Sequence, residues 1–189
     1  MILVEAIGRY RDTFRYKTIN GFDKTIVSPW RKNQIQDSAL NLITAQLIDA
    51  STNTNGLFNN FGAINYIAFG SGDVAWDADP NNVNKPVAQT TLTSEIARIA
   101  ITADNFTFLD NGGVVLNPQS ISPRFKMEIT LGANDANGDL REFGLFGGET
   151  TANADTGTMF NWITHPLIQK DNTLVIDREV DIQFSINRS

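Results

Sequence analysis

Cysteine is missing from this sequence of 189 residues, and histidine occurs once. Without cysteine there is no disulfide, no thiolate zinc site and no cysteine nucleophile. A metal centre or a Ser-His-Asp triad would have to be built around His165, and no serine lies in a strand–turn–helix elbow. We therefore interpret His165 as an edge-strand histidine packed on or near Trp162, and we expect no metal and no cofactor.

Long apolar runs and basic clusters are also missing. No stretch approaches the roughly 18 apolar residues that read as a membrane helix, and "MILVEAIGRYRDTFRYK" at the N-terminus lacks the regions of a signal peptide. Lys plus Arg number 15 against 21 Asp plus Glu, which gives a formal charge of −6. We therefore expect no membrane insertion and no nucleic-acid binding.

The residues that are abundant favour β structure. Phenylalanine occurs 12 times, and four Asn-Gly pairs supply the positive φ angles of tight hairpin turns. Apolar and polar residues alternate over 124–131 and again over 174–186, where Arg178 is the one charge on the apolar face. The prediction is a mainly β protein, an antiparallel β-sandwich or jelly-roll-like domain with one packed α-helix.

The chain is predicted to have two parts. Residues 1–32 would form an N-terminal arm or hairpin, and residues 33–189 would form the β-sandwich domain. Its helix is expected near residues 37–50, where Leu40, Ile43 and Leu47 recur at helical spacing. A long irregular loop follows around Trp76, and such loops are usually functional or disordered.

Three short motifs have a chemical interpretation and a simpler one. "LREFGLFGG" has the glycines of a phosphate loop but no Lys-Ser/Thr after them, so it reads as a core strand in which Gly144 leaves room for a neighbour. "NDANGD" resembles half of a calcium loop, but strands flank it, which favours a turn. The scattered carboxylates show no glycosidase pairing.

Two charged residues stand in apolar segments. Glu142 lies beside Phe143, and Arg98 lies in "SEIARIAI". A buried carboxylate without a partner is costly, so opposite charges in two such segments predict a structural ion pair between Arg98 and Glu142. The alternative is that Glu142 is a catalytic acid.

Four segments in order resemble a known group of proteins. They are "INYIAFGSGD", "QTTLTSEIARIAI", "LREFGLFGG" and "GTMFNWITHPLIQKDNTLVIDREVDIQF", preceded by "SPWRKNQIQDSALNLI". This order resembles tailed-bacteriophage tail-collar, tail-fibre and related virion structural proteins over residues 28–186. The resemblance implies assembly or adhesion rather than catalysis, and it carries over no active-site residue.

The expected function is therefore that of a non-enzymatic structural component of a tailed-phage virion, in the tail, collar or neck, baseplate or fibre attachment. Such a protein is made in the host bacterial cytoplasm, and its partners would be further copies of itself and other tail or neck proteins. A carbohydrate-binding module of a tail fibre, with Trp76 and Trp162 as stacking platforms for a host surface glycan, is the alternative, and a hydrolase is the third class. Aromatic residues without an evident core position mark the expected interface: Tyr10, Phe14, Tyr16, Trp30 and Trp76.

Overall fold

The chain divides into two compact units, each described separately below. The computed structural model describes residues 2–18, 21–35, 39, 64–80, 83, 86, 88–116 and 122–188. Unit 1 comprises Met1–Gln34, Thr102–Asp135 and Asp171–Ser189, and unit 2 comprises Ile35–Ile101 and Ala136–Lys170.

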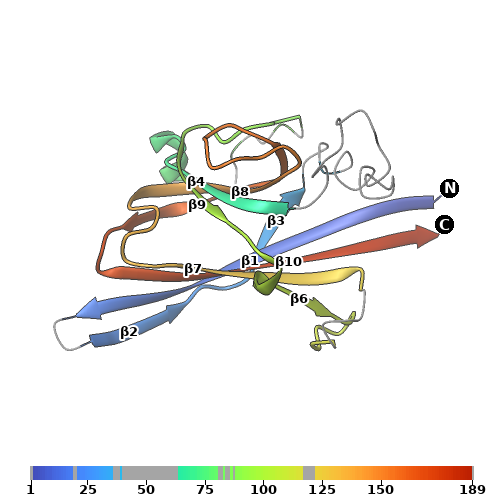
Figure 1. Cartoon of the computed structure of the whole chain (residues 1–189), viewed down its shortest axis with the longest axis horizontal. Coiled ribbons are helices and arrows are strands. Elements are labelled where there is room, and N and C mark those ends of the chain that lie inside the picture. Colours follow the sequence, from blue (N-terminus) through green and yellow to red (C-terminus); the bar gives the residue numbers. More distant parts are fainter. Residues whose placement is uncertain are drawn as a thin grey trace. The chain divides into compact units, whose positions relative to one another are not determined.

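Unit 1 is built on an antiparallel sheet (Figure 1). Its central pair is β1 and β10; β7 and then β6 follow on the β10 side, while β2 and β3 pair with different parts of β1 on its other edge. The elements are β1 (Ile2–Thr18), β2 (Gly21–Val27), β3 (Arg31–Ile35, whose last residue falls in unit 2), the short 3-10 helix η3 (Ala103–Asn105), β6 (Phe106–Leu109), β7 (Arg124–Leu131) and β10 (Leu174–Arg188).

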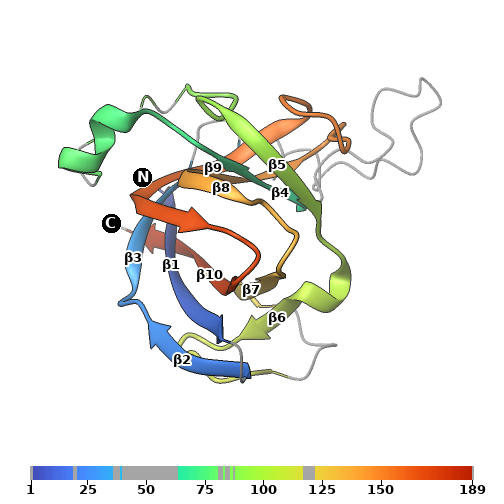
Figure 2. The ribbon, with the colours of Figure 1, turned by 90° about the vertical axis from the view of Figure 1, so that its left-hand side faces the viewer.

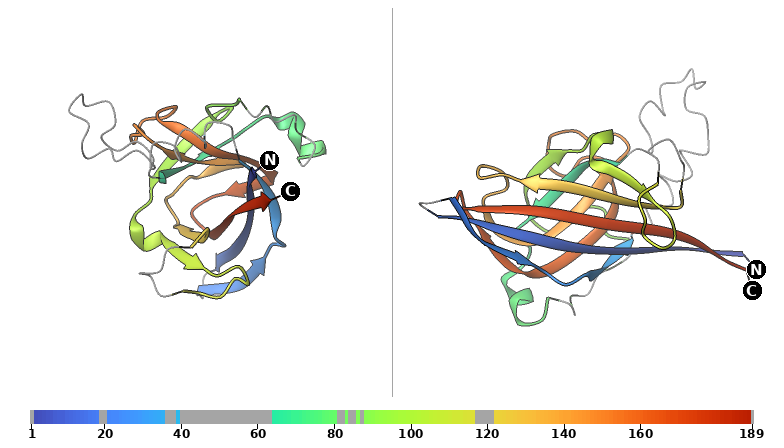
Figure 3. Two further views of the ribbon diagram at one scale, coloured as in Figure 1. Left: turned by 90° about the vertical axis from the view of Figure 1, so that its right-hand side faces the viewer. Right: turned by 90° about the horizontal axis from the view of Figure 1, so that it is seen from below.

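Strand β1 is an interior strand of this sheet. Strands β1 and β2 form the predicted hairpin, but β1 also pairs with β10 from Ile2 opposite Arg188 to Tyr16 opposite Leu174. The two ends of the chain consequently lie together (Figure 3). Strand β1 is therefore paired from Ile2 to Tyr16 with a strand from the opposite end of the chain.

The two alternating segments are both strands. On β7, Met127, Ile129 and Leu131 are buried while Glu128 and Thr130 are exposed, as the pattern predicts. On β10 the buried residues of the alternating face are Leu174, Ile176, Arg178, Val180 and Ile182. These side chains form the core of unit 1 together with Tyr10 of β1.

Unit 2 contains a second antiparallel sheet of order β5–β4–β8–β9 (Figure 2). Strand β8 is buried from Leu140 to Gly147, which confirms "LREFGLFGG" as a core strand. A Cβ on Gly144 would lie 2.7 Å from the carbonyl oxygen of Asn161, so this position needs glycine for close strand packing. The elements are β4 (Ile64–Gly70), the 3-10 helix η2 (Val74–Ala78), β5 (Glu95–Ala100), β8 (Gly138–Gly147) and β9 (Thr158–Lys170).

The predicted mainly β, antiparallel class is confirmed, and two antiparallel sheets are consistent with the predicted β-sandwich. The helix predicted near residues 37–50, with Leu40, Ile43 and Leu47, lies outside the described residues apart from Ala39, which is helical and buried. Within the described part of the chain, no helix is long and apolar enough to cross a membrane.

Candidate functional site

A cleft of about 570 Å³ lies beside Trp76 in unit 2. Asp73 caps the start of η2 by accepting a hydrogen bond from the Ala75 amide (2.9 Å), which fixes the turn that carries Trp76. The indole of Trp76 packs edge-on against Trp162, with ring centroids 6.1 Å apart. The cleft is lined by Ala75, Trp76, Ala78, Asp79, Val83, Pro86, Gln89, Thr93 and Trp162.

The two tryptophans differ in their access to solvent. Trp162 is 3% exposed and belongs to a buried cluster, whereas Trp76 is half-buried against that cluster. Only Trp76 therefore presents a substantial surface to a ligand in this cleft. Polar groups for hydrogen bonding come from Asp79, Gln89 and Thr93.

Glu142 lies fully buried behind the cleft and is held by three N–H donors. The backbone amides of Thr93 and Ser94 donate to its two carboxylate oxygens at 3.1 and 2.9 Å, and the indole Nε1 of Trp162 donates at 2.7 Å. These donors replace water around the carboxylate. Glu142 consequently anchors the chain entering β5 and orients Trp162.

The predicted ion pair between Arg98 and Glu142 is not formed. Arg98 pairs with Glu95 at 2.7 Å, and these two side chains are 1% and 2% exposed. Spacing alone does not predict this pair, because residues three apart point to opposite faces of a regular strand, and here the register between β4 and β5 shifts at Gly70. The prediction failed because backbone amides, which no side-chain pattern shows, satisfy Glu142 instead.

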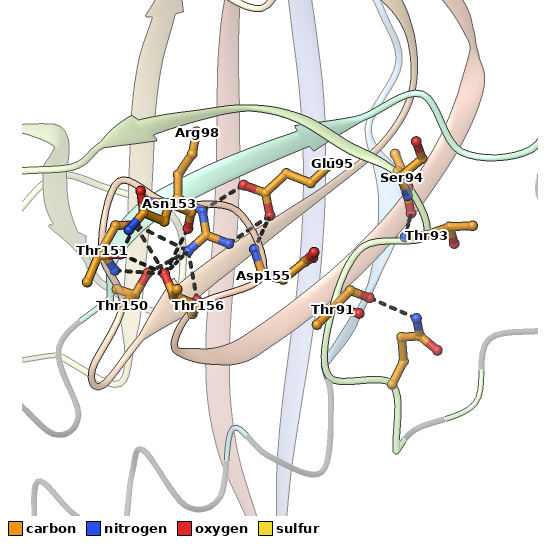
Figure 4. Close-up of polar contacts among 12 residues, drawn as sticks. Thr91, Thr93, Ser94, Glu95, Arg98, Thr150, Thr151, Asn153, Asp155 and Thr156 are labelled. Carbon is orange, nitrogen blue, oxygen red and sulfur yellow. Dashed lines mark hydrogen bonds and ion pairs between the residues drawn. The ribbon is translucent and has the colours of Figure 1, made fainter.

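Arg98 also fixes the loop between β8 and β9 (Figure 4). Its Nη1 donates to the Thr150 hydroxyl at 2.7 Å and to the Thr156 carbonyl at 2.7 Å. The guanidinium lies over the Phe146 ring, 4.5 Å from its centroid. One buried cation thus ties this polar loop to the sheet of unit 2.

A second arginine holds the Trp76 loop. Buried Arg141 of β8 donates two hydrogen bonds to Asp77, at 2.8 and 3.0 Å. The hydrogen bond from Arg141 lowers the pKa of Asp77 below its ordinary value. These two hydrogen bonds attach η2 to β8.

The predicted interface residues of unit 1 occupy different environments. Tyr10 is 2% exposed and belongs to the core of its own unit, so it does not present a surface to a partner. Phe14 and Trp30 are half-buried, and Tyr16 is 36% exposed. Next to Tyr16, β2 pairs only with β1 among the described strands and has exposed Ile26 and Val27.

Arg178, the one charge on the apolar face of β10, has a buried partner that local sequence did not reveal. Its Nε and Nη2 donate to the two carboxylate oxygens of Asp12 at 2.6 and 2.8 Å. Arg178 is 0% exposed and Asp12 is 3% exposed. This bidentate pair joins β1 to β10 inside the core.

The single histidine and the "NDANGD" turn both make contacts within the protein. His165 is buried, and its ring centroid lies 6.1 Å from that of Phe143. In the "NDANGD" turn, Asp135 accepts from the Gly132 amide and Asn137 accepts from Lys170. Across the residues that the structure describes, no group of three His, Cys, Asp or Glu side chains is placed to hold a metal ion.

The fold and these contacts define a mainly β protein whose buried charges are held by strand-to-strand and loop-to-strand bonds. Comparison with protein-family models, curated proteins and solved structures gives no match for this chain.

Proposed function

We propose that this chain is a non-enzymatic structural component of a tailed-phage virion and that it acts through protein–protein assembly. The observation that carries the proposal is the edge strand β2, on which Ile26 is 40% and Val27 is 55% exposed. A sheet edge offers backbone hydrogen-bonding groups to another chain, and apolar side chains on it add a hydrophobic contribution. The order of the four segments quoted above supplies the link to tail, collar, neck or fibre proteins by analogy.

The buried charges also support a scaffold role. Glu142, the one carboxylate considered as a catalytic acid, already accepts hydrogen bonds on both oxygens from three donors of its own unit. A general acid needs its proton directed at a substrate atom. The contacts of Glu142 therefore fit a role in holding β5 and Trp162.

The test replaces Ile26 and Val27 together with lysine and measures mass in solution by light scattering. We expect the unaltered chain to form an oligomer and the variant to shift toward the monomer with an unchanged circular dichroism spectrum. Val74→Lys is the control, since Val74 is 69% exposed but lies on the 3-10 helix η2 and not on a sheet edge. Labelling of purified phage particles with an antibody against the chain is the second measurement. A chain that is monomeric at all concentrations and is missing from particles would contradict the proposal.

The Trp76 cleft favours a second candidate function, binding of a host surface glycan. An indole surface beside Asp79, Gln89 and Thr93 combines a stacking group with hydrogen-bonding groups, as sugar recognition requires. A glycan array should then give signals that Trp76→Ala abolishes and Trp30→Ala keeps. Equal signals for both variants would place the binding elsewhere.

A further inference from the structure

The backbone of β2 has a defined hydrogen-bonding phase. The Ser28 amide donates to the Asp12 carbonyl at 2.8 Å. This bond lies next to the pair of Val27 with Thr13 in the hairpin register. Hydrogen-bonded and non-hydrogen-bonded pairs alternate along an antiparallel ladder. Val27 and Thr25 therefore belong to the non-hydrogen-bonded pairs with β1, so their N–H and C=O groups point to the other side of β2.

That other side of β2 is a free sheet edge. Among the strands that the structure describes, β2 pairs with β1 alone (Figure 1). Every residue from Lys24 to Val27 is exposed, at 40% for Ile26 and 55% for Val27. The outward-facing backbone groups of Thr25 and Val27 are thus open to pairing with a further strand.

A row of apolar side chains crosses the sheet of unit 1 and ends at this edge. Its members lie directly opposite one another on neighbouring strands: Leu131 of β7, Ile176 of β10, Phe14 of β1 and Ile26 of β2. Directly opposite residues share one face of a sheet and contact each other. Leu131 and Ile176 are buried, Phe14 is half-buried and Ile26 is exposed, so the row loses its cover toward the edge.

We propose that β2 pairs with β2 of a second copy of this chain, antiparallel and with Ile26 of one copy opposite Ile26 of the other. Thr25 of each copy then lies opposite Val27 of the other, so the outward-facing backbone groups meet as hydrogen-bonded pairs. The two Ile26 side chains form a non-hydrogen-bonded pair, in which side chains lie closest, and the apolar row continues into the second copy. The inference rests on the proposed assembly function and names the partner of that edge.

The other two-fold registers of the same phase fit this edge less well. A pair centred on Lys24 sets like charges directly opposite each other, and one centred on Thr25 sets Ile26 against Lys24. A pair centred on Val27 sets Thr25 opposite Pro29, which has no N–H for the ladder. The two-fold arrangement uses the same edge of both copies and therefore closes as a dimer. Because the paired strands are short, we expect weaker association than that of a standard interface.

The experiment uses single cysteines, because the sequence contains none. Ile26→Cys in the full chain is oxidised with copper phenanthroline and followed by non-reducing electrophoresis. A non-hydrogen-bonded pair sets the Cα atoms about 4.5 Å apart, within the range of a disulfide. Thr25→Cys is the matched control, because its two copies would be offset by about 7 Å along the strands in addition to their separation across them. We expect Ile26→Cys to form disulfide-linked dimers roughly tenfold faster than Thr25→Cys.

A mixture of Thr25→Cys and Val27→Cys chains gives an independent measurement should Ile26→Cys fail to fold. One of the two chains carries a tag that changes its size, so that mixed dimers can be told from dimers of one kind. The register sets Thr25 opposite Val27, and mixed dimers should therefore exceed both kinds of unmixed dimer.

Equal rates for Ile26→Cys and Thr25→Cys, or no dimer from any variant, would overturn the proposal. Faster dimer formation by Thr25→Cys would overturn it in favour of a pair centred on Thr25. The lysine variant and the labelling of particles test assembly itself. An oligomer that is lost in the lysine variant but gives no cysteine dimer would mean that the edge binds a different segment, so the two failures are distinguishable.

Discussion

At the scale of single residues, the burial of Tyr10 predicts that unit 1 becomes less stable at alkaline pH. Burial raises the pKa of Tyr10 to about 12, because the phenolate would lose its hydration. In the unfolded chain the tyrosine ionises near the ordinary pKa of 10.0. The stabilisation that comes from a protonated Tyr10 in the folded protein is therefore fully present below pH 10.0, and it is lost as the pH rises toward about 12.

We predict that the free energy of unfolding falls by about 2 to 3 kcal/mol over this pH range. Urea unfolding measured at increasing alkaline pH checks it. The variant Tyr10→Phe should lack this part of the pH dependence, whereas identical slopes for both proteins would contradict the assignment.

The Asp12–Arg178 pair yields a second prediction at the residue scale. Arg178→Met leaves the Asp12 carboxylate buried without its bidentate partner and should lower the free energy of unfolding by about 3–5 kcal/mol. The double variant Asp12→Leu with Arg178→Met removes both charges and should recover most of that loss. Denaturant unfolding of the single and double variants measures the coupling, and additive effects would argue against a shared pair.

At the scale of elements, one arginine determines the order of the loop between β8 and β9. Arg98→Lys keeps the positive charge but cannot bond Glu95, Thr150 and Thr156 at once. We expect faster proteolytic cleavage between residues 149 and 157, with the sheet of unit 2 retained. Lys24→Arg on β2 is the control, since Lys24 is exposed. Unchanged cleavage of the Arg98→Lys loop would mean that the loop holds its own conformation.

At the scale of the whole molecule, the sequence-distant pairing of β1 with β10 decides what truncation does. Deleting residues 2–18 removes the partner of β10 along fifteen paired positions. The truncated chain should lose amide protection in β7 and β10 by hydrogen exchange, so deletion of the N-terminal segment tests folding rather than assembly.

A circular permutant provides the control for that truncation. It joins the adjacent ends of the chain and opens it between Ala154 and Asp155, in the exposed loop before β9. This chain keeps β1 beside β10 and should retain the protection of β7 and β10. Loss of protection in the permutant as well would show that the sheet depends on the native chain order.

The sequence alone determined the class of structure and several strands. Alternation over 124–131 and 174–186 specified half-buried strands, and Gly144 among apolar residues specified a closely packed one, because these patterns are set by local geometry and burial. Only the tertiary structure decided the partners of the charges. Arg178 meets Asp12 from the other end of the chain, and Glu142 meets backbone amides that no side-chain pattern reveals. Local sequence shows that a buried charge needs a partner, but the strand register determines which group lies within hydrogen-bonding distance.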